Sequence, residues 1–212
     1  MINILSFTFG PFQENTYILF DETKQGVIID PGCSSSLERK GLLDTITDEG
    51  IELVHLLNTH CHLDHIAGNY IINEKFDLPL TMHKLDIPTL HMAPKSAELY
   101  NIPLTPSPEP GEFIDEGDTI KFGNSELRVL FTPGHAPGHV VFYNADQDFL
   151  IAGDTVFQRS IGRTDLPGGD HETLIKSIKD KILTLPDNTI IYSGHGPSTT
   201  IVEERMENPF LV

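Results

Sequence analysis

The sequence predicts an α/β (α+β) protein built as a four-layer αββα sandwich, in which two β-sheets face each other and helices cover both outer sides. Two observations lead to this prediction. Short apolar runs bounded by turn residues recur in both halves of the 212-residue chain, as is typical of strands. Segments with helical features lie between these runs, and helices on the outside of two sheets give this layered arrangement. We expect one domain over residues 1–212.

The first half of the chain is expected to hold four strands and two helices. The strands are predicted at residues 15–20, 26–30, 52–58 and 78–83. The first helix is predicted over residues 34–50, with serines near its start and Gly50 at its end. The second is predicted from His65 to Phe76.

The segment 90–111 contains a series of prolines. They stand at positions 94, 103, 106, 108 and 110. Because proline lacks a backbone N–H, a continuous helix or a central strand is not expected to carry this series. We therefore expect a surface connection or a lid over these residues.

The second half repeats the plan of the first. Its strands are predicted at residues 118–123, 126–131, 139–144, 148–153 and 189–194. A helix is predicted from about His171 to Leu185, with Asp170 as its N-cap and Pro186 beyond its end. Its apolar stripe consists of Leu174, Ile178 and Ile182.

Composition excludes several classes of function. The formal net charge of −17 argues against a nucleic-acid partner, because a phosphate backbone attracts basic proteins. The apolar runs are too short to span a bilayer, so no membrane partner is expected. Cys33 and Cys61 are the two cysteines, and they form no disulfide framework. With no secretory pattern at the N-terminus, we expect a cytoplasmic location.

The segment HCHLDH, residues 60–65, places three imidazoles and one carboxylate within six positions. Side chains of this kind are costly to bury without a partner. Other predicted strands also end in a turn followed by His or Asp, which supplies His135, Asp154, His195 and Asp30. Because functional side chains concentrate on loops held by a rigid scaffold, we expect these residues to meet at one rim of the sandwich.

Their spacing predicts two metal ions. His60 and His62 project to the same side of an extended segment and reach one ion, which His135 completes. Asp64, His65 and His195 are assigned to a second ion. Asp154 bridges the two ions, since a carboxylate has two oxygens. Imidazole and carboxylate ligands suit zinc, iron or manganese, and two ions about 3.5–4 Å apart are typical of hydrolytic sites. Asp64 is also a candidate catalytic base for water.

Several further residues have two interpretations. Asp30 either accepts a hydrogen bond from a ligating histidine or belongs to a turn, and His139 either orients a ligand or is an ordinary buried residue. Arg163 either binds a substrate carboxylate or pairs with Asp165 or Asp170. Cys61 is expected to face away from the ions. No metal role is expected for the remaining histidines, which are His55, His83, His91 and His171.

The motifs THCHLDH, TPGHAPGH, AGDTVF and SGHG resemble, in order, the metal-ligand motifs of the metallo-β-lactamase fold hydrolases. Within that superfamily, GRTDLPGGD and the ending ERMENPF look most like the short glyoxalase II-like (hydroxyacylglutathione hydrolase-like) enzymes. The resemblance assigns one ion to His60, His62, His135 and Asp154, and the other to Asp64, His65, Asp154 and His195. It also implies a metallo-β-lactamase fold without the C-terminal helical domain that contacts glutathione.

The resemblance implies an activity and a rival to it. The implied activity is hydrolysis of a small-molecule thioester, such as S-(hydroxyacyl)glutathione, by a hydroxide held on two divalent ions, with zinc expected first and iron or manganese as alternatives. The rival is a persulfide dioxygenase of the same fold, which uses one iron on residues matching His60, His135 and Asp154. A non-catalytic metal-binding module is a third possibility.

Overall fold

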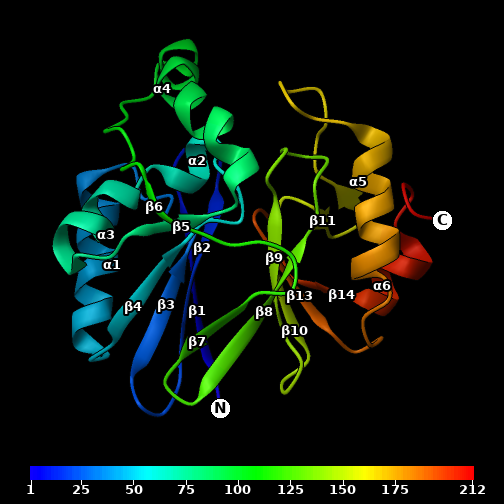
Figure 1. Cartoon of the computed structure of the whole chain (residues 1–212), viewed down its shortest axis with the longest axis horizontal. Coiled ribbons are helices and arrows are strands. Elements are labelled where there is room, and N and C mark those ends of the chain that lie inside the picture. The colour runs from blue at the N-terminus through cyan, green and yellow to red at the C-terminus, as the bar shows by residue number, and fades with distance from the viewer.

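The computed structural model describes residues 1–212, and it confirms the predicted αββα sandwich. Figure 1 shows two sheets side by side with helices on the outer face of each. The first sheet has the strand order β1 (Asn3–Phe9), β2 (Glu14–Phe20), β3 (Gln25–Ile29), β4 (Glu52–Leu57), β5 (Leu80–Met82) and β6 (Pro110–Phe113). The second has the order β14 (Thr199–Thr200), β13 (Ile190–Ser193), β10 (Phe149–Gly153), β9 (Val140–Asn144), β8 (Ser125–Phe131) and β7 (Thr119–Phe122). A small hairpin joins β11 (Val156–Phe157) to β12 (Ser160–Ile161).

Helices cover both outer faces. On the side of the first sheet lie α1 (Ser36–Asp48), α2 (Leu63–Ile66), α3 (Asn69–Phe76), the turn η1 (Lys84–Asp86) and α4 (Ile87–Tyr100). On the side of the second sheet lie α5 (His171–Ser177), which continues as the π-helical turn η2 (Ile178–Ile182), and α6 (Ile201–Glu207). None of these helices combines the length and the hydrophobicity needed to cross a bilayer.

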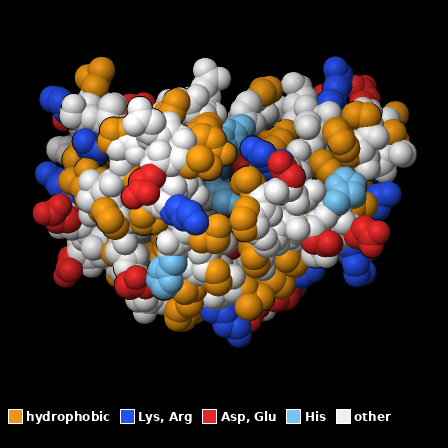
Figure 2. All heavy atoms as spheres, turned by 90° about the horizontal axis from the view of Figure 1, so that it is seen from above, with side chains coloured by type: hydrophobic (Ala, Val, Ile, Leu, Met, Phe, Trp, Pro, Cys, Tyr) orange, Lys and Arg blue, Asp and Glu red, His pale blue; other side chains and the backbone are white.

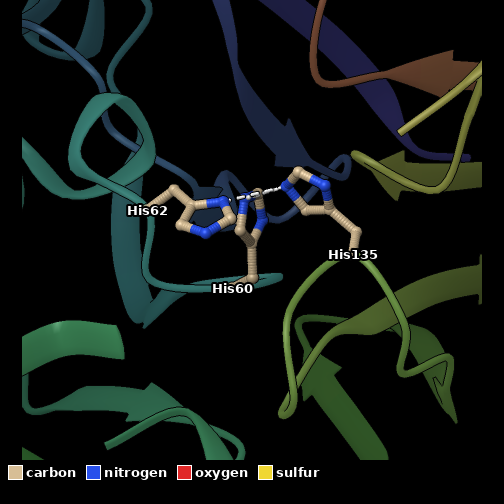
Figure 3. Close-up of side chains that lie close together, drawn as sticks. All are labelled: His60, His62 and His135. Atoms are coloured by element: carbon tan, nitrogen blue, oxygen red, sulfur yellow. Dashed lines mark hydrogen bonds between the residues drawn. The ribbon is translucent and has the colours of Figure 1, made fainter. Parts of the chain in front are cut away.

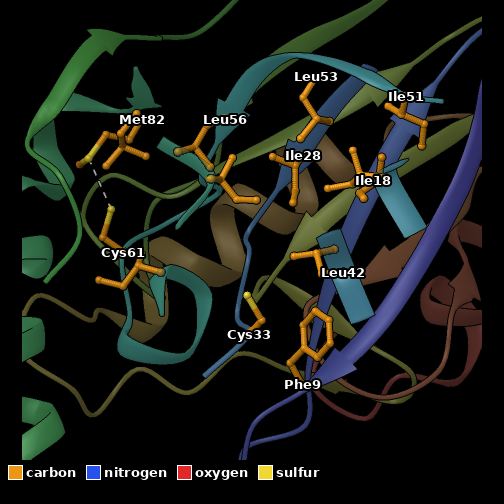
Figure 4. Close-up of a cluster of buried hydrophobic side chains, with 14 of the residues drawn as sticks. Phe9, Ile18, Ile28, Cys33, Leu42, Ile51, Leu53, Leu56, Cys61 and Met82 are labelled. Carbon is orange, nitrogen blue, oxygen red and sulfur yellow. Dashed lines mark hydrogen bonds between the residues drawn. The ribbon is translucent and has the colours of Figure 1, made fainter. Parts of the chain in front are cut away.

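Alternation along the strands generates three apolar layers. In β3, Ile28 packs toward the helices of the first sheet, in the cluster drawn in Figure 4, whereas Val27 and Ile29 pack between the sheets. In β10, Leu150 packs toward α5 while its neighbours face the inter-sheet layer. Successive side chains of a strand point to opposite faces, so strands that are covered on both sides need apolar residues at every position.

Two predicted helices have the expected ends. The side chain of Ser35 accepts a hydrogen bond from the N–H of Glu38, and the Glu38 carboxylate accepts one from the N–H of Ser35, which makes a capping box at the start of α1. Asp170 caps α5 by accepting the N–H of Thr173 at 2.8 Å. Leu174, Ile178 and Ile182 form the predicted stripe and are fully buried. The last turn of this helix is widened to π geometry.

The structure corrects two local predictions. The helix expected from His65 to Phe76 is divided into α2 and α3 around Gly68, whose N–H donates to Pro31 O and whose missing side chain leaves room for the Cys33 Sγ. The proline-rich segment is not wholly irregular, because α4 occupies residues 87–100 and continues through Pro94. Leu90 and Ala93 pack into the first-sheet core, and this burial offsets the backbone hydrogen bond that Pro94 cannot make.

We predict that Pro94→Ala stabilises the protein. The substitution restores an N–H that can donate to the carbonyl of Leu90, and the free energy of unfolding should rise by about 1–3 kcal/mol in chemical denaturation. Pro106→Ala is the matched control, since Pro106 lies in an irregular segment. There the extra freedom of the unfolded chain should lower the free energy by up to about 1 kcal/mol. Equal effects of the two substitutions would contradict a continuous α4.

Candidate metal centre

Five strands deliver polar side chains to one end of the sandwich. Asp30 follows β3, and His60 follows β4, which runs parallel to β3. Asp154 follows β10, and His195 follows the parallel strand β13. His135 lies in the loop between β8 and β9. Because both sheets contribute, the site stands over the seam between them.

The first cluster consists of three imidazoles. The Nε2 atom of His135 lies 2.9 Å from the Nδ1 of His62 and 3.2 Å from the Nε2 of His60. Figure 3 shows the three rings converging from two separate loops. His60 and His135 are almost completely buried. These three nitrogen atoms form a cluster of the size that holds a metal ion.

The second cluster contains Asp64, His65 and His195. The Nε2 of His195 lies 3.2 Å from the Oδ2 of Asp64. Asp154 stands between the two clusters. Its Oδ2 lies 3.5 Å from the Nε2 atoms of both His135 and His195, and its Oδ1 lies 3.4 Å from the Nε2 of His65. The seven predicted ligands therefore meet, with Asp154 in the shared position.

The outer nitrogen of each of four imidazoles is held by a neighbouring acceptor. His60 Nδ1 donates to the Oγ1 of Thr59 at 3.0 Å, and His65 Nδ1 donates to the Oδ2 of Asp30 at 3.0 Å. His135 Nδ1 donates to the backbone oxygen of Arg163 at 2.7 Å, and His195 Nδ1 donates to that of Phe12 at 3.0 Å. Because Nδ1 donates in each of these rings, the Nε2 atom faces the site, where it can bind a metal ion once it carries no proton.

Asp30 does more than form a turn. It has a left-handed backbone, with φ of 51°, and its buried carboxylate also accepts the N–H of Thr59 at 2.7 Å and the Thr59 hydroxyl at 2.6 Å. His139 does not join either cluster. Its Nε2 accepts the backbone N–H of Asp154 at 3.0 Å, and its Nδ1 donates to the Oγ1 of Thr132. His139 therefore fixes the backbone that carries the shared carboxylate.

Burial and neighbouring charges divide the imidazoles into two groups. Burial, reinforced by the nearby imidazoles, holds the pKa of His60 well below its ordinary value and lowers that of His62 to about 3. Burial also opposes protonation of His195, but its hydrogen bonds to Asp154 and Asp64 outweigh this effect and raise its pKa to about 10. His60 and His62 are thus neutral at pH 7, whereas His195 without a bound ion is protonated, and its positive charge offsets the negative charges of Asp64 and Asp154.

The donor set fits metal ions. The Nε2 of His65 and the Oδ1 of Asp154 are buried and have no hydrogen-bond partner, although each faces the interior of the site. Unpartnered buried polar atoms are costly, and a cation between them removes that cost. Gly194 leaves the space that the Asp154 carboxylate occupies, because a Cβ at position 194 would lie 2.2 Å from the Asp154 Oδ1.

Other predicted residues lie outside the clusters. Cys61 faces the apolar core, where its Sγ lies 3.5 Å from the sulfur of Met82. The Arg163 side chain forms a two-point ion pair with Asp165, at 2.7 and 2.8 Å, which matches one of the two interpretations left open by the sequence. The remaining histidines, which are His55, His83, His91 and His171, contribute to neither metal-type cluster.

Three contributors to the site were not identified from the sequence. Thr59 stands between Asp30 and His60, and its place beside the HCHLDH motif could have indicated this role. Glu14 is 1% exposed, and its Oε1 lies 4.0 Å from the Nδ1 of His65. Asp86, at the start of α4, accepts the N–H of Cys61. The last two are distant in sequence from every ligand and carry no local signal.

The two clusters open into a cleft of about 880 Å³. One wall is α4 and the other runs from Phe157 to Pro167, with His62, Asp64, His135, Asp154 and His195 at the base. Figure 2 looks onto this end of the molecule and shows histidine atoms within the central hollow, bordered by hydrophobic side chains. A small molecule can therefore reach the ligand clusters directly from solvent.

Comparison with known proteins gives relatives along the whole chain. Residues 9–195 match the model of the metallo-beta-lactamase superfamily. The probable metallo-hydrolase YqgX of Bacillus subtilis is 42% identical over 205 residues, which cover 95% of this chain and 94% of the relative. The hydroxyacylglutathione hydrolase GloC of Haemophilus influenzae is 37% identical, with 94% of this chain and 93% of the relative covered.

A dioxygenase and a solved structure are also similar. The mitochondrial persulfide dioxygenase ETHE1 of Mus musculus is 34% identical, over 92% of this chain and 70% of the relative. The crystal structure of TTHA1623 in a di-iron-bound form superposes with a TM-score of 0.88 at 38% identity, covering 98% of this chain and all of the other. These matches show that the chain belongs to the metallo-β-lactamase superfamily.

Proposed function

We propose that the protein is a binuclear metal-dependent hydrolase that cleaves thioesters such as S-(hydroxyacyl)glutathione. The observation that carries the proposal is the meeting of seven ligand-type side chains in two clusters around Asp154, at the base of an open cleft. The 37% identity with a hydroxyacylglutathione hydrolase supports the choice of substrate. We further propose that the chain acts as one domain in the cytoplasm.

His60, His62 and His135 would hold one ion, Asp64, His65 and His195 the other, and Asp154 both. Zinc is the metal we expect, with iron as the alternative in view of the di-iron relative. Bound divalent ions lower the pKa of water and polarise a substrate carbonyl. The carboxylate of Asp64 lines the cleft, beside the Nε2 of His195, and would take up a proton from the attacking water. A thiolate leaves without a protein acid, because its pKa is about 8.5.

The rival function is persulfide dioxygenation. It is favoured by the 34% identity with a persulfide dioxygenase and by the proximity of His60, His135 and Asp154. Two assays on one sample separate the functions. The hydrolase should release thiol from S-lactoylglutathione without consuming oxygen. Oxygen consumption with glutathione persulfide, and no thiol release, would establish the rival.

Metal content of two aspartate variants should distinguish the clusters. The wild type should hold about two ions per chain by elemental analysis. Asp154→Ala removes a ligand from both ions and should lower kcat/KM on the order of 100-fold or more, because even partners outside the ligand shell cost 10- to 100-fold. Asp64→Ala should retain about one ion. A wild type with one iron, or an active Asp64→Ala enzyme, would contradict the binuclear hydrolase.

Arg163 provides a test of the glutathione half of the substrate. If its guanidinium binds a substrate carboxylate, Arg163→Ala should lower kcat/KM by on the order of 10- to 150-fold, mostly through KM. Asp165→Ala should have the opposite effect on KM, since it frees Arg163 from its ion pair. A thioester without carboxylates is the control substrate, and it should respond to neither change. Equal losses for both substrates would make Arg163 structural.

A further inference from the structure

The helix α4 has apolar residues on two faces. On one face of the helix, Leu90, Ala93 and Ala97 are buried against the rest of the protein. Met92, Leu99 and Tyr100 are 41%, 80% and 48% exposed, and all three line the cleft. The exposed ring of Phe12 continues this surface, since it contacts Tyr100 edge to face with 5.5 Å between the ring centroids. Exposed apolar side chains grouped around a cleft are typical of a binding surface.

The charges of the cleft do not favour a strongly anionic group along α4. Two of its lining residues are Lys or Arg. Arg163 is already paired with Asp165, and Lys95 lines the cleft together with the acidic Glu98. Asp64 and Asp154 lie at the base. An apolar group therefore meets less resistance along this wall than a carboxylate does.

We propose that the apolar face of α4, formed by Met92, Leu99, Tyr100 and Phe12, binds the acyl group of the substrate, and that the enzyme prefers thioesters with an unbranched apolar acyl chain of several carbons. The inference rests on the thioesterase proposed above. The cleft that contains this face also contains the metal-type clusters, so an acyl carbon next to the scissile carbonyl at the base continues directly onto it.

The test is a series of S-acylglutathiones from lactoyl and propanoyl to octanoyl, assayed by thiol release. Each methylene that reaches α4 should raise kcat/KM by about 2- to 4-fold. Leu99→Ser and Met92→Ser should each flatten this dependence. The matched control is Leu37→Ser, because Leu37 is 79% exposed but lies on α1 outside the cleft. It should leave the dependence unchanged.

The outcomes separate this inference from the proposed function. A rate that is equal along the series, or highest for lactoyl, would overturn the apolar preference and leave the thioesterase intact. Absence of hydrolysis for every member would overturn the thioesterase, and the apolar preference with it. A dependence that survives in both Leu99→Ser and Met92→Ser would remove α4 from the acyl site.

A second observation concerns a buried acid outside both clusters. Asp86 is fully buried at the start of α4. Its Oδ2 accepts the N–H of Cys61 at 2.5 Å, and its Oδ1 accepts the N–H of Gly138 at 3.1 Å and the hydroxyl of Thr89 at 2.9 Å. Cys61 lies between His60 and His62, while Gly138 lies three residues after His135. One carboxylate therefore joins the two loops that form the first cluster.

We infer that Asp86 is a positioning residue that sets the separation of these loops and thereby the metal affinity of the first cluster. An amide at this position cannot accept from both loops with equal geometry, because its NH₂ group faces one of the two N–H donors. The hydrogen bonds of Asp86 go to Cys61, Gly138 and Thr89 and to no residue of the second cluster, so the effect should be selective.

The test is the metal affinity of Asp86→Asn, measured by chelator competition on the folded protein. One of the two ions should bind 10- to 100-fold more weakly, in the range found for residues that orient ligands, and the other should be unchanged. Asp86→Ser serves the same comparison if the amide variant does not fold. Asp21→Asn is the matched control, since Asp21 is also buried and accepts hydrogen bonds from Thr23, Asn124 and Ser125 away from the site. Unchanged affinity for both ions, or an equal loss in the control, would overturn the inference.

Discussion

The centre depends on one buried carboxylate, that of Asp154. Imidazoles from both sheets surround it, and they hold its pKa well below the ordinary value although burial alone would raise it. Its backbone N–H is fixed by His139. Glycines flank it because there is no space for larger residues. A Cβ on Gly194 would meet its Oδ1, and one on Gly153, whose φ is 48°, would meet His139 and Thr59. Glycines from two separate strand ends thus leave the space that this side chain and its neighbours occupy.

The sandwich acts as the frame for this contact. The HCHLDH segment follows a strand of the first sheet, while His135, Asp154 and His195 follow strands of the second. The distance between the two sets of ligands is therefore set by the inter-sheet core, which includes Leu57, Val140 and Ile151. Close packing resists small changes in that separation. A mutation in this layer can alter the metal centre without touching a ligand.

Predictions from the sequence succeeded where the chemistry was local. Apolar runs in both halves of the chain, with helical segments between them, predicted the layers. Turn residues after these runs indicated which side chains meet at the rim. Prediction failed for α4, because the series of prolines argued against a helix. The buried apolar stripe of Leu90, Ala93 and Ala97, which indicates a helix, was therefore overlooked. It also missed β1, which is paired along its whole length with β2, and the short helix α6. Glu14 and Asp86 were missed because only the tertiary fold brings them to the ligand loops.

The metal ligands and the cleft wall belong to different elements, since strand ends carry the ligands and α4 forms the wall. This separation matters for substrate specificity. The ligands are held by strand ends, by hydrogen bonds to Asp30 and to backbone oxygens, and by the packed core. By contrast, α4 is joined to the ligand loops through Asp86, the residue that precedes its first turn, and it exposes apolar side chains to the cleft. Exposed side chains such as Leu99 can therefore change with little cost in stability. Substrate choice can diverge along α4 while the metal chemistry beneath it stays the same.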